Sequence, residues 1–301
     1  MSDVTVGVVI PTHNRPDLLQ KAVASVLAQD VPGLRLVVVD EASDPPAADV
    51  LELSDPRVEV VRNDRPRGPA AARNQGIDLI RSEFVGFLDD DDRWLPGKLR
   101  ETLAYFERFP SVGMVIHRMG PSNSPDGTGE CRVVADPVRR MLTRQPPHVD
   151  AVLVRRSVHD QVRFDEEFPA AADLDYMLRA AKVTGVAELD RVLGVHGPSG
   201  SEMTAIALEK RIAGRLRFRE KHADLFRDRE ARAFYELRLG HLYRRAGSRG
   251  RSLAAFLRSA WIRPASPLPW KGLVSLGIPR RLLGRLLARR ARHEAHEEGA
   301  R

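Results

Sequence analysis

Short apolar runs alternate with segments of helical periodicity over the first hundred residues. The runs typical of buried strands are 4–10, 34–39, 58–61 and 84–88. The segments with apolar residues at helical spacing are 17–29, 70–80 and 96–109. Continuous apolar strands separated by helices predict a parallel sheet that is covered by helices on both faces. Ligands of such sheets bind at the carboxyl ends of the strands, so catalytic residues are expected there.

The pattern becomes looser after residue 110 and purely helical after about residue 204. Strands are expected at 112–116, 149–154 and 186–195, a helix at 173–182 and a polar loop at 121–129. The later helices are expected at 205–221, 229–246 and 250–262, followed by a break at 264–269. We therefore predict two regions, an α/β domain over 1–204 and a helical C-terminal region over 205–301.

Composition and charge narrow the range of functions. The 301 residues are 43% hydrophobic and 30% charged, which is enough apolar material for a packed core. Cys131 is the single cysteine, which excludes an intrachain disulfide and a cysteine metal cluster. The start of the chain has no basic segment ahead of its short apolar run, and no stretch is long and apolar enough to span a bilayer. These features predict a cytoplasmic protein.

The net charge of +7 comes from the C-terminal end of the chain. The segment Lys271–Arg292 holds seven basic residues and no acid, so the rest of the chain is close to neutral. It has few aromatic residues among its arginines, and nucleic-acid binding is therefore not expected. Within it, Ile278–Arg290 places four leucines on one helical stripe with arginines beside and opposite them. Such a helix can lie on the inner, anionic face of a membrane; the alternative is a solvated helix that docks its leucines on the preceding helical region.

Four adjacent carboxylates, Asp89–Asp92, directly follow the apolar run 84–88. Adjacent carboxylates repel one another unless a cation compensates them. A hard divalent metal ion bridging to phosphate oxygens would do so, because Mg²⁺, for example, takes one or two protein carboxylates and leaves other positions to the substrate. The alternative is a solvated acidic loop at the start of the helix that Pro96 opens.

Two other strand ends carry polar residues. Asp40 ends the second strand, where a carboxylate can accept hydrogen bonds from a ribose or a base, or can cap the next helix. Thr12 and Arg15 follow the first strand and can contact a nucleotide or cap a helix. The chain lacks the glycine-rich dinucleotide fingerprint and the P-loop, so the Rossmann dinucleotide and P-loop interpretations lose their main support. It also lacks the Gly-x-Ser-x-Gly elbow of serine hydrolases.

Four segments, taken in order, closely resemble the family 2 glycosyltransferases. They are Val8–Leu19, Val37–Ser43, Gly68–Ile77 and Phe87–Pro96. The resemblance covers residues 4 to about 200 and implies the GT-A fold, a mostly parallel nucleotide-binding sheet between helices. It also implies an inverting transfer of sugar from a nucleotide-sugar donor to a saccharide or lipid-linked acceptor, in polysaccharide or glycoconjugate synthesis.

The resemblance also implies roles for individual residues of the donor site. Pro11, Thr12 and Asp40 would hold the nucleoside, and Asp90 the ribose. Asp91, the last carboxylate of the Asp-x-Asp that begins with Asp89, would bind Mn²⁺ or Mg²⁺ on the diphosphate. Arg73, which matches the family's Ala-Arg-Asn, would assist the donor site or serve packing.

The second half of the chain supplies the implied base. The segment Ala172–Arg179 is similar to the family's Glu-Asp-Tyr-Asp-Leu-Trp-Leu-Arg, and the base then maps to Asp173, which otherwise reads as a helix N-cap. His196 resembles a histidine that lies near the metal and the diphosphate in this fold. The alternative is a structural role, which is the usual one for a single histidine at the end of a strand. Glu41 and Ala172 depart from the family, which has Asp and Glu at these positions.

Two other functions fit parts of the pattern. A sugar-phosphate nucleotidyltransferase would need a glycine-rich basic loop after the first strand, and residues 11–15 do not form one. A non-catalytic binding module would have lost its carboxylates, and Asp89–Asp91 and Asp173 are all present. The active transferase is therefore the preferred interpretation.

Overall fold

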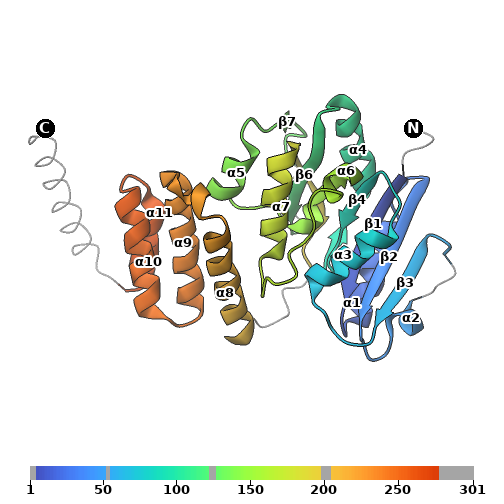
Figure 1. Ribbon diagram of the computed structural model, residues 1–301, viewed down its shortest axis with the longest axis horizontal. Coiled ribbons are helices and arrows are strands. Elements are labelled where there is room, and N and C mark those ends of the chain that lie inside the picture. Colours follow the sequence, from blue (N-terminus) through green and yellow to red (C-terminus); the bar gives the residue numbers. More distant parts are fainter. Residues whose placement is uncertain (1–4, 52–54, 122–126, 198–204, 278–301) are drawn as a thin grey trace, which may run out of the picture. The chain divides into compact units, whose positions relative to one another are not determined.

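The computed structural model describes residues 5–51, 55–121, 127–197 and 205–277 (Figure 1). The chain divides into two compact units. The first comprises Met1–Met141 and Gln145–Glu202, and the second comprises Leu142–Arg144 and Met203–Arg301. The polar loop predicted at 121–129 lies partly outside the described residues. Of the basic segment Lys271–Arg292, residues 271–277 are described, and the predicted amphipathic helix Ile278–Arg290 lies outside the described residues.

The first unit alternates strands and helices in the order that the sequence predicts. Its strands are β1 Thr5–Thr12, β2 Gly33–Glu41, β3 Val58–Asn63, β4 Phe84–Phe87, β5 Arg93–Trp94, β6 Val112–Gly120, β7 Cys131–Val133, β8 Val152–Arg155 and β9 Gly185–Val195. Its helices are α1 Pro16–Leu27, α2 Ala47–Val50, α3 Pro69–Leu79, α4 Lys98–Arg108, α5 Pro137–Thr143, η1 Val149–Ala151, α6 Arg156–His159 and α7 Ala172–Val183.

Within the described residues, nine strands form one sheet in the order β3-β2-β1-β4-β8-β6-β9-β5, with β7 paired to β9. The strands β1 to β4 are mutually parallel, and β6 is parallel to β9. The pairings of β8 with β4 and β6, and of β5 and β7 with β9, are antiparallel. The predicted α/β fold class is confirmed, and the strand pairing is mixed because β8 runs against its neighbours.

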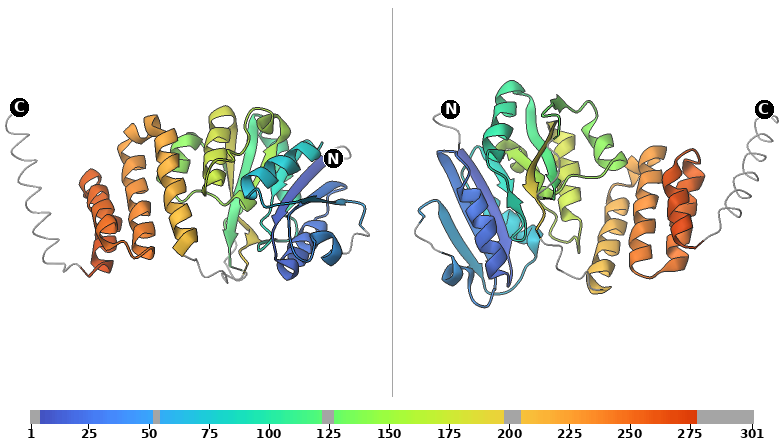
Figure 2. Two further views of the ribbon diagram at one scale, coloured as in Figure 1. Left: turned by 60° about the horizontal axis from the view of Figure 1, so that its bottom comes forward. Right: turned by 180° about the vertical axis from the view of Figure 1, so that it is seen from behind.

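Helices cover both faces of the parallel part of the sheet (Figure 1, and from behind in Figure 2). The buried residues of α1 and α4 share one core with alternate residues of β1 and β2, such as Val8 and Leu36. On the opposite face α3 lies close to β1, since a Cβ on Gly76 would be only 2.3 Å from the side chain of Val9. Glycine allows this helix to approach the strand closely.

Two strands extend further than the hydrophobic pattern predicts. The first strand was expected to stop before Pro11, but β1 continues to Thr12 and pairs Pro11 with Val39 of β2. Pairing of β1 with β4 ends at Val9, so the side of Pro11 that lacks an N–H faces no strand. The strand β2 likewise continues through the charged residues Asp40 and Glu41, because hydrogen bonds satisfy both side chains there.

The hydrophobic pattern did not predict the shortest elements. The strands β5 and β7 have two and three residues, too few to show a period. The run 149–154 divides into the turn η1 and the strand β8. The break expected at 264–269 is only partly correct, because α11 begins at Pro267, and proline is favoured in the first helical turn.

The second unit consists of packed helices that are mostly where the sequence predicts them. They are α8 Ala205–Lys221, η2 Ala223–Arg227, α9 Arg229–Arg245, α10 Arg249–Ile262 and α11 Pro267–Ser275. Phe256 of α10 is fully buried between Gly240 of α9 and Gly272 of α11, where any larger side chain would meet its ring at 2.6 Å. No described helix is long and apolar enough to cross a membrane.

An aromatic cluster joins β4 to α6 and α7. Phe87 makes edge contacts with the rings of His159, Phe164 and Tyr176. His159 is completely buried and its Nδ1 lies 3.0 Å from the hydroxyl of Tyr176. Burial lowers the pKa of His159 to about 3, and burial likewise lowers the pKa of His117 on β6 to about 3, with the charge of Lys98 adding to the effect.

These two buried histidines predict a loss of stability in mild acid. Each folded pKa lies below the unfolded value of about 6.5, so each contribution is complete above pH ~6.5 and decreases as the pH falls toward 3. Each ring then costs about 1.4 kcal/mol of unfolding free energy per pH unit. Urea unfolding between pH ~7 and ~5 should show this slope, and the two rings should not titrate by NMR in the folded protein. A folded-state titration of either ring near pH ~6.5 would contradict the prediction.

Candidate active site

The four carboxylates Asp89–Asp92 lie in the connection between β4 and β5, at the carboxyl edge of the sheet. Because β1 and β4 are parallel neighbours, the end of β1 reaches the same place, and the hydroxyl of Thr12 donates a hydrogen bond of 2.8 Å to Asp90. Both of these side chains are buried, with 3% and 5% of Thr12 and Asp90 exposed. The structure therefore brings together the predicted ends of the first and fourth strands.

Two arginines compensate three of the four carboxylates. The Nη1 of Arg15 lies 2.9 Å from Asp90 and 3.0 Å from Asp91. Arg73, from α3, is almost completely buried and pairs with Asp89. Burial raises the pKa of Asp90 and of Asp91, and the charge of Arg15 opposes this rise. The two arginines thus compensate part of the negative charge that, from the sequence, only a metal ion was expected to compensate.

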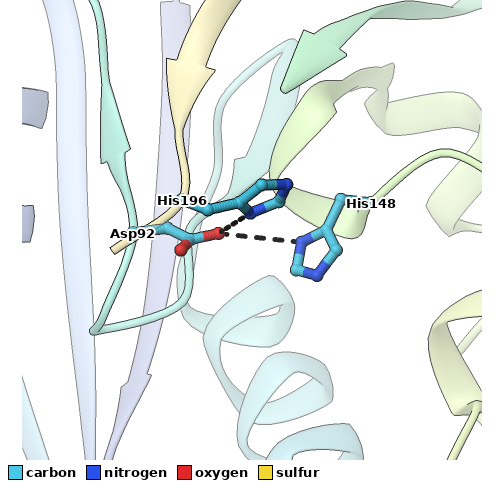
Figure 3. Close-up of side chains that lie close together, drawn as sticks. All are labelled: Asp92, His148 and His196. Carbon is cyan, nitrogen blue, oxygen red and sulfur yellow. Dashed lines mark hydrogen bonds and ion pairs between the residues drawn. The ribbon is translucent and has the colours of Figure 1, made fainter. Parts of the chain in front are cut away.

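The fourth carboxylate, Asp92, faces two histidines (Figure 3). Its Oδ2 lies 3.2 Å from Nδ1 of His196 and 3.8 Å from Nδ1 of His148, and its Oδ1 accepts a 2.9 Å hydrogen bond from the amide of Gly197. Burial favours a raised pKa for Asp92, but its hydrogen bonds with Asp150 and Gly197 and the charges of both histidines lower it.

A fully buried carboxyl group, Asp150, lies behind the acidic run. Its Oδ1 accepts a 3.0 Å hydrogen bond from the amide of Asp89, and its Oδ2 lies 3.0 Å from Nδ1 of His148. Burial raises the pKa of Asp150 well above its usual range, and the charge of Asp89 adds to the rise. Burial opposes charge on His148 as well, yet Asp150, Asp89 and Asp92 raise its pKa to about 9.

A buried lysine lies close to this carboxyl. Lys98 has no exposed surface, and its Nζ lies 3.6 Å from the ring centroid of Trp94 without a hydrogen-bond partner among the described residues. The indole of Trp94 in turn donates a 2.9 Å hydrogen bond to the carbonyl of Asp150. Burial lowers the pKa of Lys98 well below its usual value, while the charge of Asp150 acts in the opposite direction.

The end of β2 is held by hydrogen bonds within the protein. Asp40 is completely buried and accepts hydrogen bonds from the amides of Ser43 (2.8 Å) and Ala47 (2.9 Å) and from Arg62 (2.7 Å). Burial alone would raise the pKa of Asp40, but these hydrogen bonds lower it. Glu41 accepts hydrogen bonds from the amide of Gly68 (2.6 Å) and from Asn63, so its longer side chain fixes the start of α3.

The predicted base lies at the start of α7. Asp173 is the second residue of this helix and is half-buried, and the N-cap position is held by Ala171 without a side-chain hydrogen bond. Its charge acts on the buried guanidinium of Arg73, as do the charges of Asp89 and Asp150. The nearby Asp175 is completely buried and paired with Arg179 at 2.6 Å.

Strained backbone marks the loops around these side chains. Three non-glycine residues among those described have a left-handed φ: Asn14 (56°), Ala42 (60°) and Ala171 (67°). They follow β1, follow β2 and precede α7. Such conformations cost of order 1–3 kcal/mol and are common at functional sites. The turns next to Thr12, Asp40 and Asp173 are thus held in specific conformations.

The family model for glycosyl transferase family 2 matches residues 7–157, the segment that contains the acidic run and Asp150. The protein WcaA of Escherichia coli (strain K12), named as a colanic acid biosynthesis glycosyl transferase, is 30% identical over 248 residues, which cover 76% of this chain and 85% of that protein.

The chain belongs to glycosyl transferase family 2.

This transferase moves a sugar from a nucleotide-sugar donor to an acceptor hydroxyl. Over a shorter stretch of 100 residues it is 35% identical to WfgD of E. coli, named as a UDP-Glc:α-D-GlcNAc-diphosphoundecaprenol β-1,3-glucosyltransferase, covering 33% of this chain and 40% of that protein. Its fold is similar to that of S. aureus TarS 1–349 in complex with UDP-GlcNAc, with a TM-score of 0.58 at 16% identity, covering 86% of this chain and 91% of that chain.

The structure of the transferase brings most of the predicted site residues to one edge of the sheet, and adds others. Pro11 and Thr12 end β1, Asp89–Asp91 follow β4, and Arg73 and His196 each contact the acidic run. Asp91 contacts Arg15, whereas His196 contacts Asp92. Sequence reasoning missed His148 and Asp150. The signal for Asp150 was a carboxylate inside a run that was expected to be a buried strand.

The two arginines at the acidic run predict very different costs of substitution. Arg73→Gln would leave Asp89 without its partner, and removal of one member of a buried pair costs about 3 kcal/mol. Arg15→Gln is the matched control, because its side chain is 41% exposed and exposed pairs contribute less than about 1 kcal/mol. Urea unfolding at neutral pH measures both losses. Equal losses in the two variants would show that burial does not determine the strength of these pairs.

Proposed function

We propose that the transferase inverts the anomeric centre, depends on a divalent metal, and uses Asp173 as the base that activates the acceptor. The observation that carries this proposal is the position of Arg73. Its buried guanidinium pairs with Asp89 of the acidic run and also experiences the charge of Asp173 on α7. One arginine thus connects the proposed donor loop with the proposed base.

The nucleoside would bind at the ends of β1 and β2. Pro11 and Thr12 line this edge, and the ribose would bind to Asp90, which Thr12 and Arg15 already orient. Asp40 has no exposed surface, so its proposed role is to position the loop after β2 and Arg62 around the nucleoside. Arg73 would act in the donor site through its ion pair with Asp89.

The residues beside the diphosphate position suit Mn²⁺ or Mg²⁺. Of the two carboxylates predicted as metal ligands, Asp91 is the more accessible, with 36% of its side chain exposed compared with 29% for Asp89. Asp91 would therefore hold the ion, and Asp89 and His196, which have partners of their own, would support it. When bound, the metal supplies a positive charge that offsets the charge developing on the leaving diphosphate.

The transfer itself needs a base on the acceptor side. The carboxylate of Asp173 would accept the proton of the acceptor hydroxyl as its oxygen attacks the anomeric carbon, and the bond to the diphosphate breaks on the opposite face. Attack from the opposite face inverts the configuration. Arg15 and Arg73 keep the acidic run compensated while the donor is absent, and water must be excluded to prevent hydrolysis.

Asp173→Asn tests the base. This variant should lower the rate of transfer by about 10²–10⁴-fold, because the acceptor hydroxyl loses its proton acceptor. Donor affinity, measured by calorimetry, should stay near that of the wild type. Glu167→Gln, which replaces an exposed acid in the preceding loop, is the matched control and should transfer normally. Wild-type transfer by Asp173→Asn would place the base elsewhere.

Asp91→Asn and chelation test the donor metal. With Mn²⁺ present, UDP at a hundredfold excess over its Kd should stabilise the wild type by about 2.7 kcal/mol. EDTA or the substitution should remove most of that stabilisation, because the diphosphate then lacks its cation. Thermal shift and calorimetry measure both effects. GDP is tested in parallel with UDP to identify the preferred nucleotide base. Equal nucleotide affinity with and without metal would refute this assignment.

The relatives suggest the class of acceptor. WcaA is named for colanic acid synthesis and WfgD for a diphosphoundecaprenol-linked substrate. We propose a lipid-linked or growing saccharide as the acceptor in polysaccharide or glycoconjugate synthesis, at the cytoplasmic face of a membrane. The basic amphipathic helix predicted over Ile278–Arg290 would then bring the enzyme to anionic lipid.

Truncation of residues 278–301 tests this surface attachment. The full chain should co-sediment with vesicles that contain anionic lipid at low salt, since each basic residue near the surface contributes about 1 kcal/mol. Binding should weaken at high salt and on purely zwitterionic vesicles. The truncated chain should lose most of it. Unchanged binding after truncation, or no binding by the full chain at low salt, would contradict the attachment.

A further inference from the structure

Exposed apolar side chains are concentrated in one short part of the second unit. Seven large hydrophobic residues are exposed among the residues that the structure describes, and four of them lie in α10 and α11: Leu257, Trp261, Leu268 and Val274. Trp261 is the most exposed of the seven, with 64% of its surface accessible. Single exposed apolar residues need no explanation, but a group of them marks an interaction surface.

Leu257 and Trp261 form one exposed stripe on α10. They are four residues apart, so their side chains are neighbours on the same side of this helix. The other side of α10 is used for packing, because Phe256, Ser259 and Ala260 are buried there. The hydroxyl of Ser259 donates a 2.7 Å hydrogen bond to a carbonyl of α9. The stripe therefore lies on the side of α10 that does not pack against the neighbouring helices.

The same part of the chain carries positive charge and no negative charge. Residues 237–277 contain eight arginine and lysine residues and no aspartate or glutamate. Arg258 and Arg263 pair with Glu236 and Glu230, which precede this range. Four of the other basic residues are exposed and form no ion pair with a described residue: Arg244, Arg245, Arg249 and Lys271. An apolar stripe on a positively charged unit fits a partner that is both apolar and anionic.

We propose that the stripe of Leu257 and Trp261 is a membrane-contact surface, in which the indole of Trp261 enters the headgroup region of an anionic bilayer. Tryptophan is enriched at this depth, because its ring is apolar and its N–H forms hydrogen bonds. Anionic lipid also attracts the basic residues of the same helices. The inference rests on the proposed attachment to anionic lipid, and it assigns a second contact that is separate from the predicted helix Ile278–Arg290.

Charge disfavours the two protein partners that would otherwise cover the stripe. A second copy of this chain would bring the same positive helices together, and the chain has no acid between residues 237 and 293 to compensate them. The segment 278–292 carries six further arginines and no acid, so its docking on α10 would also bring like charges together. Anionic lipid compensates the charge of both segments.

The experiment measures quenching of tryptophan fluorescence by brominated lipid. The full chain is mixed at low salt with vesicles of phosphatidylcholine and phosphatidylglycerol that carry bromine on their acyl chains. The emission of the wild type should shift to shorter wavelength and be quenched. Trp261→Phe should lose most of this response. Trp270→Phe, which removes a half-buried tryptophan of α11, is the matched control and should keep it.

The strength of binding is measured by co-sedimentation with the same vesicles. The double variant Leu257→Ala, Trp261→Ala should bind about tenfold more weakly than the wild type, because less apolar area then leaves water. Leu79→Ala is the control, since it shortens a leucine of the first unit that is 40% exposed, compared with 37% for Leu257. It should bind as the wild type does. Circular dichroism establishes that each variant is folded.

Three results would overturn this contact. Bound wild type without quenching, or unchanged binding of the double variant, would leave Ile278–Arg290 as the contact and keep the proposed attachment. A dimer that Trp261→Ala separates, measured by light scattering, would make a second copy the partner. Emission of Trp261 that is already shifted without lipid, and returns on truncation of residues 278–301, would show that this segment covers the stripe.

Absence of any binding by the full chain at low salt would contradict both the proposed attachment and this contact. Donor binding and sugar transfer do not enter these measurements. The proposed catalytic residues are therefore tested independently of the membrane contact.

Discussion

Repulsion among the four carboxylates of Asp89–Asp92 is the constraint around which the first unit is arranged. Parallel strands deliver these side chains to one edge of the sheet, and their partners come from four other elements: α3, the loop after β1, the end of β9 and the segment before η1. Because each partner belongs to a different part of the chain, compensation of the acidic run also holds those parts together. The site and the fold therefore depend on the same ion pairs.

The same arrangement prepares the enzyme for a charged donor. A nucleotide sugar carries negative phosphates, and at the proposed donor site it would meet carboxylates that Arg15 and Arg73 already balance. Beneath them, the buried groups Asp150 and Lys98 have pKa values shifted toward their neutral forms. Both shifts favour less charge in the core, where an unpaired ion would cost several kcal/mol. The charge of Asp173 on α7 also acts on Arg73, so this cation would link the proposed donor site with the proposed base.

Much of the fold follows from short-range pattern in the sequence. Apolar runs and helical periodicity located β1 to β4, β9 and the helices α8 to α10 within a few residues. A buried strand requires a continuous apolar run, and a helix that buries one face requires apolar residues at helical spacing. The pattern could not show that β8 runs antiparallel between β4 and β6, or that β5 and β7 exist. Pairing direction depends on which distant strands meet, and strands of two or three residues carry no period.

The site divides in a similar way. The sequence by itself determined that Thr12, Asp40 and Asp89–Asp92 end parallel strands at one edge, and its motifs indicated Arg73 and Asp173. Only the tertiary structure decided which charges meet: Arg15 with Asp91, His196 with Asp92, and Asp150 behind both. Residues such as His148 and Asp92 are separated by more than fifty positions, and no local period links them. Their contact arises from the crossing of loops at a sheet edge, where small backbone differences decide which side chains lie within hydrogen-bonding distance.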